Sequence, residues 1–116
     1  MEIQPCNDKK IPPIEITSLH YYGKTVLYNV DLLREDTIFK IPQMFNVNDI
    51  FNEDDVVDKE RAMANISTEP IIITKLENEY GVLDGKHRLY RAKNMGQKEI
   101  QAFFYELKEL EKYILK

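Results

Sequence analysis

The sequence predicts an α+β fold in which helices flank a mixed sheet. Apolar runs of strand length recur along the chain, segments with helical spacing lie between them, and no repeat or low-complexity tract interrupts the pattern. A chain of 116 residues is expected to form one domain, because smaller units struggle to bury a core. With 43% hydrophobic and 31% charged residues, the composition is that of a globular protein. We therefore expect a single domain over residues 1–116.

The first third of the chain predicts an irregular lead-in followed by two strands. Residues 1–13 hold three of the five prolines, which neither continue a helix nor donate to a sheet ladder. Residues 14–30 are rich in β-branched and aromatic side chains, with Gly23 as a turn signal, and predict two short strands. Residues 31–44 favour no single element, since a helical turn there must end before Pro42.

The central segments predict a helix, a hairpin and a second helix. Helical spacing of apolar residues after an acidic cap predicts a helix that begins near Asp55. Residues 70–74 and 80–83 are short apolar runs on either side of a polar connection, which is typical of a β-hairpin. Good helix formers over residues 86–95 are followed by Gly96, where a left-handed C-terminal cap belongs.

The C-terminal segments predict one more strand and a final helix. Residues 100–105 are apolar and aromatic, as in a strand. Beyond them Leu107, Leu110, Ile114 and Leu115 mark the apolar face of a helix.

Charge and cysteine content limit the classes of partner and compartment. A net charge of −4 gives no general attraction to DNA, so a DNA partner is disfavoured unless a local basic patch exists. The single cysteine, Cys6, provides neither a disulfide framework nor a zinc cluster. Neither a leader-like start nor about 18 consecutive apolar residues occurs. We expect a cytoplasmic protein with no membrane partner.

The segment 82–88 predicts a strand, a tight turn and a helix start that bind phosphate. Backbone amides at a helix start have no partner within the helix, and the helix dipole is positive there. Gly85 removes the β-carbon that would block close approach of an anion. Lys86, His87 and Arg88 add side-chain donors, of which arginine can make a bidentate phosphate contact.

Two readings of this segment remain open from local physics alone. Asp-Gly is also a common turn dipeptide, and cationic residues at a helix start can simply be solvated. However, acidic side chains are normally favoured in the first turn by ~0.3–1 kcal/mol each, so three cationic or potentially cationic residues oppose the dipole. A bound anion would resolve this conflict. Asp84 either caps the helix or binds a divalent cation such as Mg²⁺ that bridges phosphate oxygens.

The order and spacing of these residues resemble the central motif of the ParB/sulfiredoxin superfamily. The resemblance rests on residues 70–73, on residues 81–93 and on Gly96, and it extends over roughly residues 55–105. It implies a ParB/sulfiredoxin-like mixed sheet and a nucleotide pocket in which a Gly-x-x-Arg segment holds phosphates. The pair of His87 and Arg88 resembles the His-Arg pair of sulfiredoxins and of free-serine kinases of the same fold.

The resemblance also narrows the activity. Lys86 stands where sulfiredoxin carries its cysteine, so reduction of a sulfinic acid is not expected. Full ParB segregation proteins add a helix-turn-helix domain and a dimerisation tail, for which we expect no room in 116 residues. The clustered carboxylates and histidines of a metal-dependent nuclease are not evident in the sequence.

The leading hypothesis is therefore a domain that binds the phosphates of ATP or CTP, with Mg²⁺ as the expected companion ion. Gly85, Lys86, His87 and Arg88 are the predicted phosphate ligands, and hydrolysis or phosphoryl transfer to a small molecule remains open. Asp84 and Glu53 are the candidate catalytic carboxylates, although Glu53 could equally belong to a solvated helix start. The alternative is a non-catalytic module from a phage or mobile element that binds DNA or a protein. A homodimer is compatible with either hypothesis.

Overall fold

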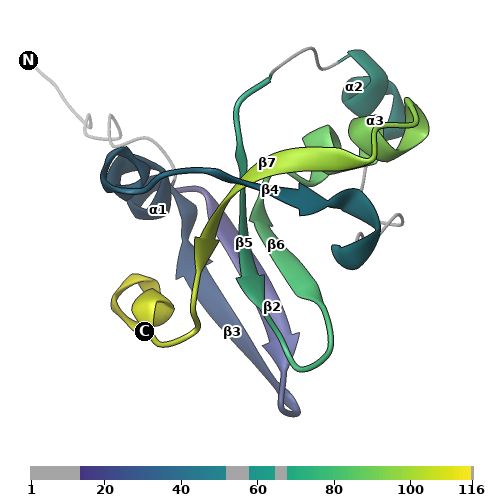
Figure 1. Cartoon of the computed structure of the whole chain (residues 1–116). Helices are drawn as coiled ribbons and strands as arrows, with labels where there is room; N and C mark the ends of the chain where they lie inside the picture. Colours follow the sequence, from purple (N-terminus) through teal and green to yellow (C-terminus); the bar gives the residue numbers. More distant parts are fainter. Residues whose placement is uncertain (1–13, 52–57, 65–67, 116) are drawn as a thin grey trace, which may run out of the picture.

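A computed structural model describes residues 14–51, 58–64 and 68–115 (Figure 1). The described residues begin with an antiparallel pair, β2 (Ile16–Tyr21) and β3 (Lys24–Asn29), which confirms the two strands predicted there. Between them Tyr22 and Gly23 both have positive φ, at 51° and 75°. Two successive positive φ values are the mark of a type I′ turn, whose twist matches that of the flanking strands.

The second sheet has four strands in the order β4-β7-β5-β6. Its strands are β4 (Gln43–Asn46), β5 (Ile71–Lys75), β6 (Tyr80–Asp84) and β7 (Glu99–Tyr105). β5 pairs antiparallel with β6 and parallel with β7, and β7 pairs antiparallel with β4. The predicted hairpin and the predicted mixed sheet are both confirmed.

In the described residues, three α-helices accompany the sheets: α1 (Val30–Asp36), α2 (Lys59–Ala64) and α3 (Lys86–Asn94). In α1 the side chain of Asn29 accepts the Leu32 N–H at 3.2 Å, and the chain continues through the 3-10 turn η1 (Thr37–Phe39) into β4. A further 3-10 turn, η2 (Val47–Asp49), follows β4. Within the described part of the chain, none of the helices is long and apolar enough to cross a membrane.

Helices α2 and α3 correspond to the two helices predicted in the central segments. The predicted start of the first, near Asp55, lies outside the described residues, and α2 begins at Lys59. The side chain of Asp58 accepts the Arg61 N–H at 3.1 Å there. The second prediction is confirmed, with Gly96 at φ 76° just beyond α3.

The predicted C-terminal helix is wrong. The chain forms only the short 3-10 helix η4 (Glu109–Tyr113), which buries Leu110 and Tyr113. Ile114 then forms a bridge with Tyr28 of β3, and the Leu115 N–H donates to the Leu27 carbonyl at 2.9 Å. Backbone pairing with a strand far back in the sequence therefore replaces the further helical turn that the apolar spacing indicated.

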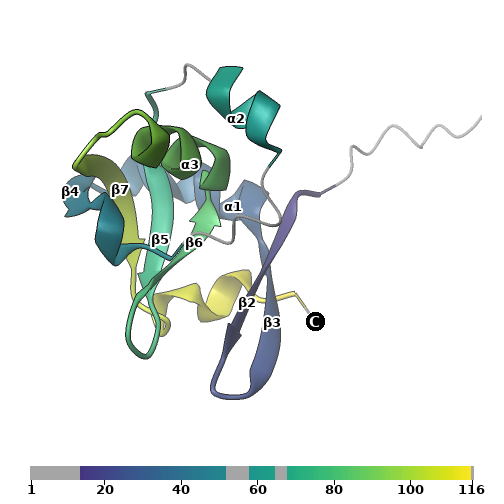
Figure 2. The same ribbon diagram turned by 90° about the vertical axis from the view of Figure 1, so that its right-hand side faces the viewer.

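The core lies on both faces of β5. Ile71 and Ile73 pack with Leu89 of α3, whereas Ile72 faces the cluster around Tyr28 of β3. All three isoleucines are at most 1% exposed, as expected for a strand covered on both sides. Figures 1 and 2 show α2 and α3 at one end of the molecule and the tip of the β2–β3 hairpin at the other. This arrangement leaves the β6–α3 turn beside the start of β2.

Candidate functional site

The turn from β6 into α3 requires glycine at position 85. Gly85 is the N-cap of α3 with φ 103°, a left-handed conformation that other residues rarely adopt. A β-carbon there would lie 2.4 Å from Cγ2 of Ile71 and 2.9 Å from Nη2 of Arg88. The Leu89 N–H donates to the Gly85 carbonyl at 2.9 Å, which places the amides of residues 86–88 before the first helical hydrogen bond. These amides are the donors that a helix start offers to an anion.

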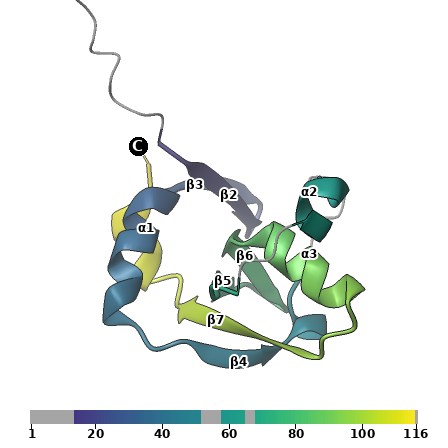
Figure 3. The same ribbon diagram turned by 90° about the horizontal axis from the view of Figure 1, so that it is seen from above.

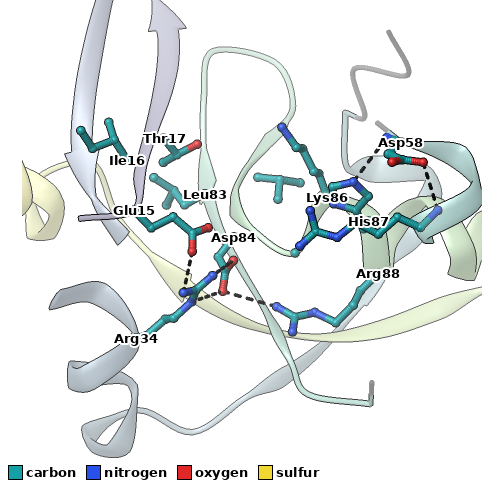
Figure 4. A pocket seen from close by; sticks show the side chains of 13 residues that line it. Glu15, Ile16, Thr17, Arg34, Asp58, Leu83, Asp84, Lys86, His87 and Arg88 are labelled. Carbon is teal, nitrogen blue, oxygen red and sulfur yellow. Dashed lines mark hydrogen bonds and ion pairs between the residues drawn. The ribbon is translucent and has the colours of Figure 1, made fainter. Parts of the chain in front are cut away.

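Asp84 is held by two arginines. Its carboxylate accepts from Nε and Nη2 of Arg34 at 2.9 and 2.8 Å, and from Nη2 of Arg88 at 3.4 Å (Figure 4). The N-cap of α3 is Gly85 and, among the described residues, no side-chain hydrogen bond caps this helix, so capping, one of the two roles considered for Asp84, is not observed. Burial raises the pKa of the Asp84 carboxyl, but the hydrogen bonds and charges of Arg34 and Arg88 outweigh it, and the net pKa lies below the usual 3.8.

The sequence did not point to Arg34, which reaches the site from α1. Its guanidinium also pairs with Oε1 of Glu15 at 2.8 Å, and its side chain is 44% exposed. The hydrogen bond to Asp84 raises the pKa of Arg34 further above its usual range, although burial opposes this. No local motif surrounds Arg34, and only tertiary packing, in which α1 contacts β2 and η4, brings it to Asp84 at the turn.

Arg88 is a partly buried guanidinium with long contacts. Its side chain is 14% exposed, and its Nη1 lies 3.5 Å from Oε1 of Glu69 while its Nη2 lies 3.4 Å from Asp84. Its Nε is buried and has no hydrogen-bond partner among the described residues. Buried charged donors are normally satisfied, because desolvation without a partner is costly. Arg88 therefore has donor capacity that the described residues do not use.

His87 is tied to the start of α2. The Asp58 N–H donates to Nε2 of His87 at 3.3 Å, so this nitrogen carries no proton in that contact. Burial lowers the pKa of His87 below 6.5, and the charges of Arg61 and Lys86 lower it further, against the opposing effect of Asp58. Asp58 and Arg61 are additional site residues that the sequence did not single out.

These side chains surround a cavity of about 550 Å³. It lies between the start of β2, the β6–α3 turn and the start of α2. Its charged lining consists of Arg34, Arg61, Lys86 and Arg88 on the cationic side and Glu15, Asp58 and Asp84 on the acidic side, with His87 between Lys86 and Arg88 in the chain. All of the predicted phosphate ligands line this cavity, together with Asp84.

Two further predictions concern a catalytic carboxylate at Glu53 and a metal ion at Asp84. Glu53 lies outside the described residues. Within the described ranges, no group of three or more His, Cys, Asp or Glu side chains could hold a metal ion. An ion at Asp84 would therefore need most of its ligands from water or from phosphate oxygens, as Mg²⁺ commonly does.

A second cavity of about 520 Å³ adjoins the first. Arg34, Asp84 and Arg88 line both cavities and so form the wall between them. Pro70 and Phe103 contribute apolar surface to the second cavity. The site therefore consists of a charged compartment and a more apolar one that share a pair of arginines.

Comparison with known proteins yields a partial likeness of structure. No protein-family model matches the sequence, and no curated protein matches it. Among solved structures, the chain is similar to sulfiredoxin from Arabidopsis thaliana, with a TM-score of 0.46 and 16% sequence identity over 57% of this chain and 85% of that chain. This likeness concerns backbone arrangement over part of the chain and does not bear on the chemistry of the site.

The geometry itself indicates what the site can do. Helix-start amides, the lysine at position 86 and three guanidinium groups, those of Arg34, Arg61 and Arg88, line one cavity. Such donors suit a compact anion with several oxygen acceptors. The lowered pKa of His87 keeps its ring neutral near pH 7, so it can donate or accept a hydrogen bond there without adding charge.

Proposed function

We propose that the cavity at the β6–α3 turn binds the phosphate groups of a nucleoside triphosphate, ATP or CTP. The observation that carries the proposal is Arg88, a partly buried guanidinium whose buried Nε has no partner among the described residues and whose Nη contacts are long. Phosphate oxygens would supply the missing acceptors in bidentate geometry.

Each residue of the turn has a distinct role in this proposal. Gly85 lets the phosphates approach the amides, Lys86 supplies a point charge, and His87 and Arg88 donate hydrogen bonds. Arg34 adds a second guanidinium from α1. The neighbouring cavity offers apolar surface to the nucleoside on the far side of the two arginines.

Binding is favoured over catalysis at Asp84. A carboxylate with a lowered pKa and two arginine partners is a weak general base. Coordination of Mg²⁺ by Asp84 would require the carboxylate to exchange Arg34 for the ion. Hydrolysis and phosphoryl transfer therefore form a separate hypothesis, in which the metal arrives bound to the nucleotide.

We also propose that the chain is a divergent member of the ParB/sulfiredoxin superfamily. The support is the order and spacing of the motif residues, together with the strand, glycine turn and helix in which the motif lies. In this proposal the chain binds nucleotide but does not reduce sulfinic acids, because Lys86 stands where sulfiredoxin carries its cysteine.

Calorimetric titration with ATP, CTP, GTP and ADP, each with and without Mg²⁺, tests the proposal. Arg88→Ala should weaken nucleotide binding by about tenfold to a hundredfold, which corresponds to the loss of a charge-assisted hydrogen bond. Arg91→Ala is the matched control, because Arg91 lies on the same helix, donates to the Met63 carbonyl and does not line the proposed phosphate cavity. The nucleotide affinity of the Arg91→Ala variant should equal that of the wild type.

The same samples separate a binding protein from an enzyme. If wild-type protein binds none of the nucleotides, the proposed function is wrong. If a nucleotide binds and neither free phosphate nor a phosphorylated small hydroxyl compound accumulates, the protein is a binding module rather than a hydrolase or kinase.

A further inference from the structure

A further cavity, of about 640 Å³, lies between the end of α1 and η4. These two elements are in contact, and Figure 3 shows α1 against the yellow C-terminal segment that contains η4. The residues that line this cavity differ from those that line the two arginine-walled cavities described above. Its volume is within the range of roughly 300–1,000 Å³ that is typical of small-molecule sites. We call it the α1–η4 cavity.

A buried phenol in the α1–η4 cavity has no hydrogen-bond partner among the described residues. Tyr105, the last residue of β7, lines the cavity and is 3% exposed, and its hydroxyl is the unpartnered group. The adjacent Tyr113 differs, since its hydroxyl donates to Oδ2 of Asp36. Buried hydroxyls normally have a partner, because desolvation without one is unfavourable. The Tyr105 hydroxyl therefore has bonding capacity for a molecule that enters the cavity.

Two carboxylates act on this phenol without bonding to it. Burial raises the pKa of Tyr105, and the charges of Asp36 and Glu109 raise it further, so the hydroxyl stays neutral. Both side-chain contacts of Asp36 among the described residues, from Tyr113 and from Lys112 at 3.8 Å, are made to Oδ2. Oδ1 of Asp36 and the Tyr105 oxygen are thus two acceptors without a donor in the described part of the chain. An ammonium group, which has three donors, can use both.

Two lysines offer positive charge to the same cavity. Lys108 is the N-cap of η4 and Lys112 lies in its last turn, and both line the cavity. Lys108 forms no ion pair with the described residues, and Lys112 is 70% exposed with its ammonium 3.8 Å from Asp36. Lys40, by contrast, is already bound to Glu109 at 2.8 Å. Lys108 and Lys112 can therefore bind an anionic group of a ligand.

The balance of charge in the lining indicates the class of ligand. Six charged side chains line the cavity, three of each sign, namely Lys40, Lys108 and Lys112 with Asp36, Glu109 and Glu111. A simple cation or a simple anion meets repulsion as well as attraction there, whereas a molecule with both charges can place each beside its opposite. Phe39, which is 81% exposed, adds apolar surface to the lining.

We propose that the α1–η4 cavity binds a free α-amino acid with an apolar side chain. The ammonium group of the amino acid donates to Oδ1 of Asp36 and to the Tyr105 oxygen. Its carboxylate accepts from Lys108 and Lys112, and its side chain packs on Phe39. This site is independent of the proposed nucleotide site, because no residue lines both cavities.

Calorimetric titration with L-leucine and L-phenylalanine tests the proposal. We expect at least one of them to bind with a dissociation constant of about 0.1–10 mM. The amide of that amino acid keeps the ammonium group and lacks the carboxylate, whereas its N-acetyl derivative keeps the carboxylate and lacks the ammonium group. Each derivative should bind at least about tenfold more weakly, because it leaves one end of the cavity unpaired.

Two variants of the lining locate the binding site. Tyr105→Phe removes only an oxygen that has no partner among the described residues, so thermal melting should show an intact fold. The same variant should bind the amino acid at least about tenfold more weakly, and so should Lys112→Ala, which changes an exposed side chain.

Lys75→Ala is the matched control for Lys112→Ala. Both ammonium groups lie over a tyrosine ring, that of Lys75 at 4.7 Å from the centre of Tyr80 and that of Lys112 at 5.2 Å from the centre of Tyr113. Lys75 does not line the α1–η4 cavity, so the amino acid affinity of Lys75→Ala should equal that of the wild type.

Three results would overturn the proposal. The first is that neither amino acid binds the wild type at about 10 mM, in which case the Tyr105 hydroxyl meets water alone. The second is an affinity unchanged in either Tyr105→Phe or Lys112→Ala, which places the amino acid elsewhere. The third is an amide or N-acetyl derivative that binds as tightly as its parent. Nucleotide titration of Tyr105→Phe should match that of the wild type, which keeps this test separate from the proposed function.

Discussion

At the scale of the residue, Gly85 shows how a single position serves both the fold and the site. The sequence predicted close approach at this turn from glycine alone, and the structure supplies two physical reasons. Its φ of 103° excludes ordinary side chains, and the packing of Ile71 leaves no space for a β-carbon. The glycine is thus required by the native fold before any ligand is considered.

Substitution of Gly85 should separate these two effects. Gly85→Ala should destabilise the protein by about 2–4 kcal/mol, because backbone strain adds to the clash with Ile71. Gly96→Ala provides the control, since Gly96 has φ 76° with open space around the added carbon, and it should cost only about 1–2 kcal/mol. Urea denaturation of both variants measures the difference. Equal losses would mean that the contact with Ile71 contributes nothing.

The main partner of Asp84, Arg34, could not be predicted from the sequence. A carboxylate immediately before a helix is ordinarily read as a cap, because caps are local. The strongest contacts of Asp84 instead come from Arg34, which is 50 residues away in the chain. No spacing rule connects two residues at that separation.

At the scale of the element, the Arg34–Asp84 pair joins α1 to β6, and its contribution should depend on pH. Asp84→Asn should lower the free energy of unfolding by about 1–3 kcal/mol at about pH 7, since it removes charge-assisted hydrogen bonds at a side chain that is 13% exposed. The folded pKa of Asp84 is below 3.8, so this stability is present above 3.8 and is lost as pH falls through the folded value.

Denaturation of wild type and Asp84→Asn across the acidic range checks the sign. The gap between the two proteins should shrink as pH falls below 3.8. Asp31→Asn is the control, because Asp31 lies 3.8 Å from Arg34 and is 47% exposed, and such surface pairs contribute at most about 1 kcal/mol. A gap that stays constant over the whole range would contradict the assignment.

Elements with dense local signals were predicted from the sequence. The β5–β6 hairpin and α3 combine apolar periodicity with turn and cap residues over a few positions. Helix α1 was not predicted, although Asn29 directly before it is a favourable N-cap residue that could have indicated its start. The helix predicted for the C-terminal segment was wrong because the local apolar spacing indicated a helix, whereas a long-range bridge to β3 determines the structure there.

At the scale of the whole molecule, the fold class was predictable and the assembly of the cavity was not. The α+β class follows from elements that each leave a mark in the sequence. The cavity combines Glu15 before β2, Arg34 on α1, Asp58 before α2 and the β6–α3 turn, which only tertiary packing brings together. The sequence therefore predicted the turn but not the residues from other elements that line the rest of the cavity.

Anion binding should be linked to the protonation of His87. The free protein holds the pKa of His87 below 6.5, and a bound anion would raise it, so binding takes up a proton. Sulfate, which keeps its charge in this range, should raise the melting temperature more as pH falls from about 8 toward 6, through the usual ligand linkage. Asp58, Arg61 and Lys86 are the charged neighbours that shape this titration.

Two controls make the measurement specific. Sodium chloride at equal ionic strength should not reproduce the effect, and His87→Gln should retain sulfate stabilisation while losing its pH dependence. The same pH dependence in His87→Gln would assign the proton to another group.

The separation of Arg34 and Asp84 also has a consequence for the order of folding. The β5–β6 hairpin closes through a short connection, whereas the Arg34–Asp84 pair closes a segment of 50 residues, at a larger entropic cost. We expect this contact to form after the transition state. Weakening it would then accelerate unfolding and leave the folding rate nearly unchanged, so the lifetime of the native chain, rather than the speed of its formation, depends on one ion pair.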